Sequence, residues 1–374
     1  MARTADFAVI GGGIAGASAA AELAGAARVV LIEREARPGY HTTGRSAALY
    51  TCTYGPPGVR ALSRASGPAF RAWTGPAGAP LLRPRGVLFI AREDQRGALS
   101  ALESEMAGAL TPVTPPDARA RMPLLREDYA AAALWDEEAS DIDVDALHQR
   151  YLRALGAAGG EVLTDAEVQG VARAGDLWRV ETKQGPVEAP VIVNAAGAWA
   201  DEVARLAGVA PIGLTPKRRT AALIDPPGGP AGEAWPMVVD AEEGFYMKPD
   251  AGKLLISPAD ATPCAPCDAQ PEELDVAIAV DRIERAFAVS VRRIDHKWAG
   301  LRSFVADGEP VAGFAPEAPG FFWLAGQGGY GIQTAPALGR LAAALALNRS
   351  LPSDLAAGGV DPATFAPGRP ALAA

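Results

Sequence analysis

The chain has 374 residues, of which 35 are Lys or Arg and 44 are Asp or Glu, so its formal net charge is −9. Apolar residues make up 49% and charged residues 21%, an ordinary globular composition that excludes wholesale disorder. A negative chain without a basic run argues against nucleic acid and against anionic lipid as partners. At roughly 150 residues per domain, the length indicates two or three domains.

Three cysteines are too few for a disulfide framework, so we expect a protein of the reducing cytoplasm. The apolar residues 7–23 are broken by glycines and lack a preceding basic cluster, so we interpret them as structure and not as a signal peptide. The sequence contains no uncharged apolar run of about 18 residues, and we therefore expect no transmembrane helix.

The N-terminal residues predict strand, glycine turn, helix and strand, because residues 6–10 and 28–33 are continuous apolar runs. Between them, Gly11, Gly13 and Gly16 have the spacing of the dinucleotide fingerprint. Glycines permit the tight turn and a close approach to pyrophosphate, and the helix N-terminus offers free N–H groups. The alternative is a tight turn without a ligand.

An acidic residue follows the second strand at the expected place. Glu33 can bind both ribose hydroxyls, whereas Arg34 beside it would suit a phosphorylated ribose. Because the adjacent carboxylate repels that phosphate, we favour the unphosphorylated form.

The following segments alternate between helix and strand before a change of character at residue 216. The patterns predict a loop over 38–55, a helix over 59–73, a strand over 81–91, a helix over 93–110, a strand over 134–141, a helix over 145–158, a strand over 161–163, a hairpin around 177–181, a strand over 191–193 with a turn over 194–199, strands and hairpins over 216–305, a strand over 321–325, a glycine-rich turn over 326–331 and a helix over 332–347.

These patterns predict an α/β fold in which a Rossmann-like dinucleotide-binding domain is interleaved with an antiparallel α+β substrate domain. We expect the first domain over 1–80, 140–215 and 300–365, the second over 81–139 and 216–299, and a loose tail over 366–374.

The first glycine motif alone does not separate a nicotinamide from a flavin. The turn over 326–331 again joins an apolar strand to a helix, whose N-terminus would stabilise negative charge on a reduced flavin. Two such turns, one at each end of the chain, indicate one long cofactor contacted twice. The alternatives are a connector without chemical importance and a nicotinamide enzyme that uses only the first motif.

Several motifs together resemble the flavin-dependent amino-acid oxidase (DAO) family, which includes D-amino-acid oxidases, glycine oxidase and sarcosine oxidase. They are residues 11–16, Glu33, 44–47, 194–199, 300–302, 307–308 and 326–331. Within this family, longer segments such as 245–252 and 298–308 are most similar to the bacterial D-arginine (broad D-amino-acid) dehydrogenases.

The resemblance implies a glutathione-reductase-like flavin domain with noncovalent FAD, and a substrate held beneath the flavin ring by the second domain. The residues implied to contact FAD are Gly11, Gly13, Ile14, Ala15, Gly16, Glu33, Arg34, Thr43, Gly44, Arg45, Ser46, Ala47, Val168, Ala196, Gly197, Trp199, Arg302, Gly328, Gly329, Tyr330, Gly331, Ile332, Gln333 and Thr334.

Two arginines would grip the substrate carboxylate, since a planar guanidinium suits a carboxylate. The resemblance assigns this role to Arg219 and Arg302, and it implies a pocket lined by Tyr54, Tyr246, Gly329 and Gln333. The alternatives are a surface salt bridge for each arginine, a solvated face for Tyr246 and a packed aromatic for Tyr54.

The implied reaction is oxidative deamination of a D-amino acid: a hydride passes from Cα to flavin N5, and the imino acid hydrolyses to a 2-oxo acid and ammonia. Positioning supplies most of the rate. Oxygen or a quinone or other carrier would accept the electrons, and we expect a monomer or small homo-oligomer. The alternatives are an oxidase of a secondary amine such as sarcosine and a flavin-binding protein without turnover.

Two positions depart from the D-arginine enzymes, which have a histidine where this chain has Leu49 and a glutamate where it has Val87. Because a buried cation without a carboxylate is unstable, we expect neutral or apolar substrate side chains. Cys264 and Cys267 have the spacing of half a metal site, but no second pair lies near, so we interpret them as incidental thiols and expect no metal.

Overall fold

The computed structural model describes residues 2–106 and 108–372. A six-stranded sheet lies at its centre in the order β10-β3-β2-β14-β21-β20, with all neighbours parallel except β20 and β21. Its strands are β2 (Phe7–Ile10), β3 (Val29–Ile32), β10 (Glu161–Leu163), β14 (Val191–Asn194), β20 (Val311–Phe314) and β21 (Phe321–Ala325).

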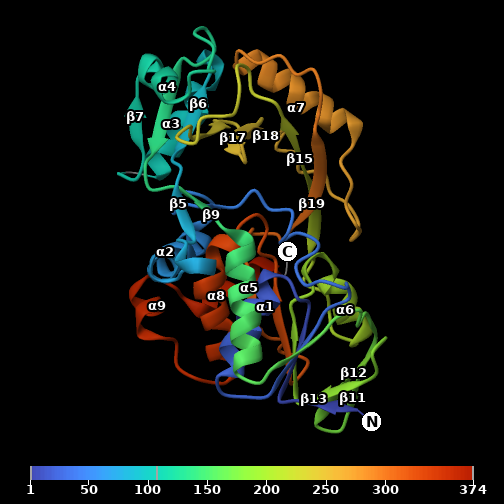
Figure 1. Cartoon of the computed structure of the whole chain (residues 1–374). Coiled ribbons are helices and arrows are strands. Elements are labelled where there is room, and N and C mark those ends of the chain that lie inside the picture. The colour runs from blue at the N-terminus through green and yellow to red at the C-terminus, as the bar shows by residue number, and fades with distance from the viewer. Residues whose placement is uncertain (1, 107, 373–374) are drawn as a thin grey trace.

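Both faces of this sheet are covered, which is why every residue of β2, β3 and β21 is buried. Helices α1 (Ile14–Ala24), α5 (Val144–Ala157) and α8 (Gly331–Ala346) lie together on one side, as Figure 1 shows. A four-stranded sheet packs on the other face through Trp178 and Val180. Its strands are β1 (Arg3–Thr4), β11 (Val168–Ala174), β12 (Leu177–Thr182) and β13 (Val187–Ala189).

An eight-stranded sheet forms the other half of the molecule in the order β19-β15-β18-β17-β16-β6-β8-β7, and only β16 and β6 pair in parallel. Its strands are β6 (Val87–Ala91), β7 (Thr111–Val113), β8 (Ala132–Asp136), β15 (Thr215–Ile224), β16 (Met237–Asp240), β17 (Tyr246–Asp250), β18 (Lys253–Ser257) and β19 (His296–Phe304).

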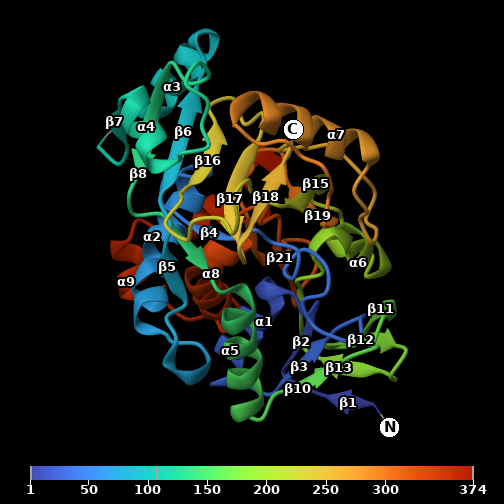
Figure 2. The ribbon, with the colours of Figure 1, turned by 45° about the horizontal axis from the view of Figure 1, so that its top comes forward.

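Alternation along the strands gives this sheet two different apolar faces. Ala222, Met247 and Ile256 pack with helix α7 (Glu273–Ala286), which lies across the sheet in Figures 1 and 2. Ala221 and Tyr246 face the opposite side and form a separate cluster. The second face therefore supplies one wall of the space between the two large sheets.

A three-stranded sheet, β4 (Leu49–Tyr50), β9 (Ser140–Ile142) and β5 (Leu82–Pro84), lies between the two halves (Figure 1). None of the helices in the described ranges is long and apolar enough to cross a membrane. The remaining helices are α2 (Pro57–Ala72), α3 (Arg96–Glu105), α4 (Pro115–Arg121), α6 (Ala200–Leu206), α9 (Ser353–Ala357) and the 3₁₀ helices η1 (Pro76–Gly78), η2 (Glu93–Gln95), η3 (Gly197–Trp199), η4 (Pro362–Phe365) and η5 (Pro370–Leu372).

The structure confirms the expected α/β fold with an interleaved, largely antiparallel second sheet. We retain the division into two domains as a proposal, with β19 running across the boundary expected at residue 300. The expected strands and hairpins over 216–305 are present, but the expectation missed helix α7, which lies among them. Its buried residues Val276, Ala279, Ile283 and Ala286 recur every three or four positions, so the helical period was present in the sequence.

Three other expected elements differ in extent. The strand over 81–91 is two strands, because the backbone turns at Gly86, where φ is +70° and a Cβ would lie 1.9 Å from the Trp135 ring. The strand over 134–141 is likewise split into β8 and β9. The helix over 93–110 is η2 followed by α3 and ends at Glu105.

The expected loose tail over 366–374 is not observed in its described part, and residues 373–374 lie outside the described residues. The guanidinium of Arg369 donates to both carboxylate oxygens of Asp307, at 2.7 and 2.8 Å, and to the carbonyl oxygens of Glu309 and Pro310. Arg369 is buried, so these contacts tie the chain end to the turn after β19.

Replacing Arg369 with alanine should lower the free energy of unfolding by about 2–3 kcal/mol, because it removes a buried guanidinium that donates to a carboxylate and leaves the carbonyl oxygens of Glu309 and Pro310 without this donor. Arg340→Ala is the matched control, since Arg340 makes a similar two-point contact with the exposed Asp354, which should contribute no more than about 1 kcal/mol. Denaturant unfolding measures both variants. A loss no larger than that of Arg340→Ala would show that the tail contact contributes no more than an exposed ion pair.

Candidate functional site

One cavity lies at the carboxyl ends of the parallel strands and reaches the second face of the eight-stranded sheet. This edge of a parallel sheet is where ligands bind in α/β folds. The predicted site residues that line it are Gly11, Gly13, Ile14, Ala15, Glu33, Arg34, Thr43, Arg45, Ser46, Ala47, Val168, Ala196, Gly197, Trp199, Arg219, Tyr246, Arg302, Gly328, Gly329, Gly331 and Ile332.

The turn between β2 and α1 forms a cradle at one part of the cavity. Gly11 has φ of +106°, and a Cβ there would lie 2.3 Å from the carbonyl oxygen of Ala195. Gly13 caps α1 without a side-chain hydrogen bond, and the N–H of Ile14 donates to the hydroxyl of Thr43 at 3.0 Å, which leaves the other N–H groups of the first turn for a ligand. A glycine turn at a helix N-terminus fits the pyrophosphate of a dinucleotide.

The third glycine does not line the cavity. A Cβ on Gly16 would lie 1.9 Å from the carbonyl oxygen of Gly11, so this glycine lets α1 approach β2. That is the close-packing role expected for the last glycine of the motif.

Glu33 is buried at the end of β3 and is held by the main chain. Its Oε2 accepts from the N–H of Gly12 and its Oε1 from the N–H of Glu35, each at 2.8 Å. Burial raises the pKa of Glu33, while these two hydrogen bonds lower it. The carboxylate is therefore fixed at the cavity wall, where a ribose could meet it.

Arg34 is engaged by other residues. It donates to Glu167 at 2.9 Å, and its guanidinium carbon lies 4.8 Å from the centre of the Trp199 ring. Arg45 is similarly engaged, since it donates to the carbonyl oxygens of Ala269 and Ala299 and pairs with Asp268. Both arginines border the cavity while supporting its wall.

Arg219 of β15 and Arg302 of β19 come from neighbouring strands and meet at the cavity. The Nε of Arg219 donates to the carbonyl oxygen of Asp260 at 2.7 Å, and Nη1 of Arg302 donates to the hydroxyl of Tyr54 at 3.2 Å. Within the described residues, neither guanidinium has a carboxylate within 4.0 Å. Burial and then the positive charge of Arg302 lower the pKa of Arg219.

Two neighbouring cations without a carboxylate make this end of the cavity a place for an anion. Tyr246 of β17 lies at the same end. The ring of Tyr54 packs edge-on against Tyr330 at 4.9 Å, and a Cβ on Gly329 would lie 2.9 Å from Nη1 of Arg302. The glycine-rich turn after β21 is thus in direct contact with Arg302.

Five predicted residues besides Gly16 do not line the cavity. Tyr54 and Tyr330 lie beside Arg302 as described, and the N–H of Gly44 closes a turn by donating to the carbonyl oxygen of Gly39 at 2.8 Å. The Gln333 amide donates to the Ser63 hydroxyl at 2.9 Å, between α8 and α2, and the Thr334 hydroxyl donates to the carbonyl oxygen of Tyr330 at 2.9 Å. Leu49 and Val87 also lie outside the lining.

Several lining residues were missed. Most lie within or beside a recognised motif or end a strand, which is the signal that could have found them. They are Ile10, Ile32, Gly39, Tyr40, His41, Thr42, Ala166, Glu167, Ala195, Ala198, Glu202, Val203, Leu206, Ala221, Gly300, Leu301, Ser303 and Gln327.

His148 supports the glycine turn from α5, since its Nε2 lies 2.8 Å from the carbonyl oxygen of Gly12 and therefore carries the proton. Burial lowers the pKa of His148. The unfolded chain thus takes up the second imidazole proton more readily than the folded protein, and the free energy of unfolding should fall as the pH drops through about 6.5. We expect His148→Gln, which keeps a donor, to lose less stability than the wild type between about pH 7 and pH 5.5 in denaturant unfolding. An identical loss in both proteins would contradict this.

Among the described residues, no group of three or more His, Cys, Asp or Glu side chains could hold a metal ion. Cys264 and Cys267 place their sulfur atoms 3.5 Å apart on the loop that contacts Arg45.

Comparison with known proteins gives a consistent assignment. The profile of the family described as FAD dependent oxidoreductase (DAO) matches residues 6–345. The FAD-dependent oxidoreductase domain-containing protein 1 of Bos taurus is 30% identical over 178 residues, which are 43% of this chain and 36% of that protein. The mitochondrial sarcosine dehydrogenase of Homo sapiens is 25% identical over 349 residues, covering 86% of this chain and 37% of that protein. The chain thus spans little more than a third of the length of these curated relatives.

A crystal structure of glycine oxidase from Geobacillus kaustophilus has the same fold, with a TM-score of 0.81 and 24% identity over 98% of this chain and 99% of that one.

Proposed function

Because the chain belongs to the FAD dependent oxidoreductase (DAO) family and its cofactor is FAD, we propose that it oxidises the Cα–N bond of a D-amino acid with a neutral or apolar side chain. The products would be a 2-oxo acid and ammonia, formed when the imino acid reacts with water. The D configuration and the noncovalent attachment of FAD rest on the resemblance of segments 245–252 and 298–308 described above.

The residues present fit FAD. The cradle formed by Gly11, Gly13 and the first turn of α1 would hold its pyrophosphate, and Glu33 its ribose. The turn over 328–331 would lie against the flavin. When bound, FAD supplies the hydride-accepting chemistry that the side chains of the protein lack.

The single observation that carries the proposal is the pair Arg219 and Arg302, two adjacent guanidinium groups on a cavity wall without a carboxylate partner among the described residues. A substrate carboxylate would neutralise them and accept their N–H groups. This contact fixes the α-carbon in orientation relative to the remainder of the cavity, and orientation supplies most of the rate in such a reaction.

An apolar cluster next to the arginines supports a substrate with an uncharged side chain. Ala47, Ala221 and Tyr246 belong both to this cluster and to the cavity wall. Met237, Val239 and Trp298 pack around them. A cationic side chain would lose its hydration among these residues without gaining a carboxylate. This cluster replaces Leu49 and Val87 as the reason for the proposed selectivity.

The second candidate is a secondary amine such as sarcosine, which also carries a carboxylate for the two arginines. It is favoured by the similarity to human sarcosine dehydrogenase, which extends over 86% of this chain. Sarcosine has no side chain and would leave the apolar cluster without a contact.

Steady-state kinetics with an artificial electron acceptor separates the candidates. We expect kcat/KM for D-leucine or D-phenylalanine to exceed that for sarcosine and for D-arginine by at least about tenfold, which corresponds to burial of roughly two methylene groups. A higher kcat/KM for sarcosine would select the second candidate. A higher value for D-arginine would contradict the role of the apolar cluster.

A further inference from the structure

A buried carboxylate outside the cavity holds the segment that carries Tyr54. Asp136 ends β8 and is 2% exposed. Its Oδ2 accepts from the hydroxyls of Thr51 and Thr53, at 2.6 and 2.7 Å, and its Oδ1 accepts from the N–H of Glu138 at 3.1 Å. Both threonines are buried, and their hydroxyl oxygens lie 2.8 Å apart. The carboxylate therefore has a complete set of donors and clamps two alternate residues of the segment.

The residue that follows the clamped pair reaches the arginine site. Tyr54 directly follows Thr53, and its hydroxyl accepts from Nη1 of Arg302 at 3.2 Å. Asp136 itself is anchored in the eight-stranded sheet, where β8 pairs with β6 and Asp136 lies opposite Val87. The carboxylate thus links a regular sheet to a segment that has no regular structure at 51–55.

We propose that Asp136 is a positioning residue: by holding Thr51 and Thr53, it sets the hydroxyl of Tyr54 against Arg302 and so keeps that guanidinium oriented for a substrate carboxylate. The inference rests on the proposed function, because it assigns a purpose to the Tyr54 and Arg302 contact. Hydrogen bonds to a charged acceptor are about twice as strong as neutral ones, which suits a clamp that must hold an irregular segment.

The test is a double-mutant cycle on the FAD-loaded protein with Asp136→Asn and Tyr54→Phe. Asparagine has nearly the same shape but only one acceptor oxygen and no charge. That oxygen can accept either from the two threonine hydroxyls, more weakly than a carboxylate does, or from the N–H of Glu138, but not from all three donors. We expect Asp136→Asn to raise the KM of the amino acid substrate by roughly tenfold, with a smaller change in kcat. In the Tyr54→Phe background, the same change should have less than about a third of this effect.

Additive effects of the two changes would overturn the inference, because a purely structural carboxylate would act equally with and without the tyrosine hydroxyl. If Asp136→Asn does not fold, Thr53→Val takes its place in the cycle, because valine keeps the volume of the side chain and removes one donor. Calorimetry with benzoate, a carboxylate without an amine, measures carboxylate binding without turnover. The Kd of benzoate should rise in Asp136→Asn and not in the control Gln95→Ala.

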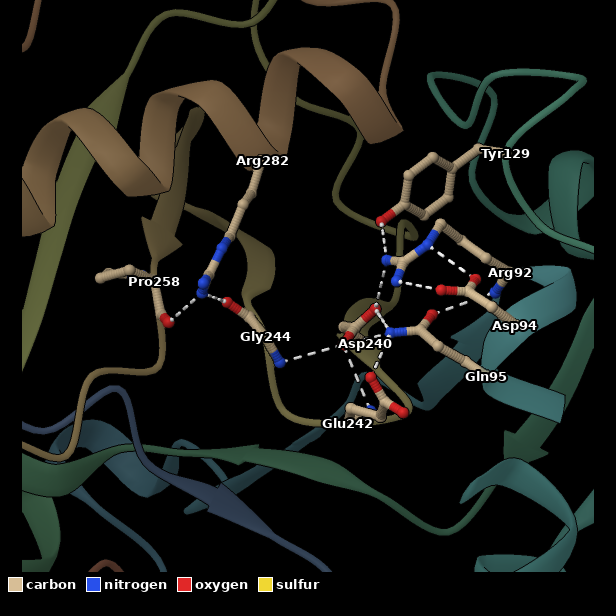
Figure 3. A network of polar contacts seen from close by, with 9 residues as sticks. All are labelled: Arg92, Asp94, Gln95, Tyr129, Asp240, Glu242, Gly244, Pro258 and Arg282. Atoms are coloured by element: carbon tan, nitrogen blue, oxygen red, sulfur yellow. Dashed lines mark hydrogen bonds and ion pairs between the residues drawn. The ribbon is translucent and has the colours of Figure 1, made fainter. Parts of the chain in front are cut away.

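Gln95→Ala is the matched control for the loss of a buried polar contact in the same sheet region. Gln95 is 2% exposed and donates to both oxygens of the buried Asp240, at 3.0 and 3.1 Å, as Figure 3 shows. Among the described residues it makes no hydrogen bond to Tyr54, Arg219 or Arg302, so KM and the benzoate Kd should stay within about twofold of the wild type. If Arg302→Ala also leaves KM unchanged, the proposed function fails. If Arg302→Ala raises KM and Asp136→Asn does not, only the inference about Asp136 fails.

Discussion

Replacing Arg302 with alanine is expected to lower kcat/KM for the amino acid substrate by about 10²- to 10³-fold while FAD stays bound. The guanidinium of Arg302 lies beside that of Arg219 on the cavity wall, and no carboxylate of the described residues lies within 4.0 Å to neutralise either. In the proposed complex the substrate carboxylate has this role. Its removal leaves an anion without its principal donor.

Steady-state kinetics measures the loss, and the flavin absorbance of the purified variant measures FAD content. Arg293→Ala is the control, since Arg293 is exposed and pairs with Asp295 away from the cavity. A value of kcat/KM within about threefold of the wild type would exclude Arg302 from carboxylate binding.

Replacing Gly16 with alanine should weaken the binding of FAD, because the new methyl group would lie 1.9 Å from the carbonyl oxygen of Gly11. The contact is with backbone, so α1 must move away from β2 and carry its N-terminus from the pyrophosphate site. Overpacking of about 1–3 kcal/mol corresponds to a rise in the Kd of FAD of roughly 10- to 100-fold.

Gly25→Ala tests the same substitution at the other end of the same helix. Gly25 has φ of −64°, and a Cβ there would lie 3.8 Å from its nearest neighbour, the carbonyl oxygen of Glu22. Titration of the apoproteins with FAD, followed by flavin fluorescence, compares the two variants. Equal FAD affinities for both would show that the close approach of α1 to β2 is not required.

The nucleotide half of the cavity could be predicted from the sequence because its signals are local. Gly11, Gly13 and Glu33 lie within one strand, helix and strand unit, and each is at the cavity or beside it. The second turn could be found for the same reason, since residues 326–331 directly join β21 to α8.

The substrate half depends on contacts between distant segments, which no local pattern contains. Tyr54 and Arg302 are 248 positions apart, and Asp136 holds Thr51 across 85 positions. Gln333 was expected in the pocket, but its side chain faces α2, where its amide donates a hydrogen bond to the hydroxyl of Ser63. The helical period of α8 predicts which residues share one face of the helix, and only the packed structure shows which neighbouring element covers that face.

The expectation of a loose tail was wrong because the amino-acid composition of a segment does not reveal which ion pairs it forms. The segment after residue 365 is rich in proline, glycine and alanine, yet Arg369 within it binds Asp307, and Phe365 just before it is fully buried. One aromatic side chain and one arginine are enough to order such a segment.

Anaerobic mixing of the FAD-loaded protein with D- and L-amino acids and sarcosine tests the central proposal most directly, with flavin absorbance as the readout. We predict rapid bleaching by D-leucine and D-phenylalanine, weak bleaching by D-arginine and none by the L-enantiomers. The rate of recolouring in air then distinguishes oxygen from another electron acceptor. Bleaching by sarcosine alone would move the substrate to secondary amines, and no bleaching by any carboxylate-bearing amine would contradict the assignment of Arg219 and Arg302.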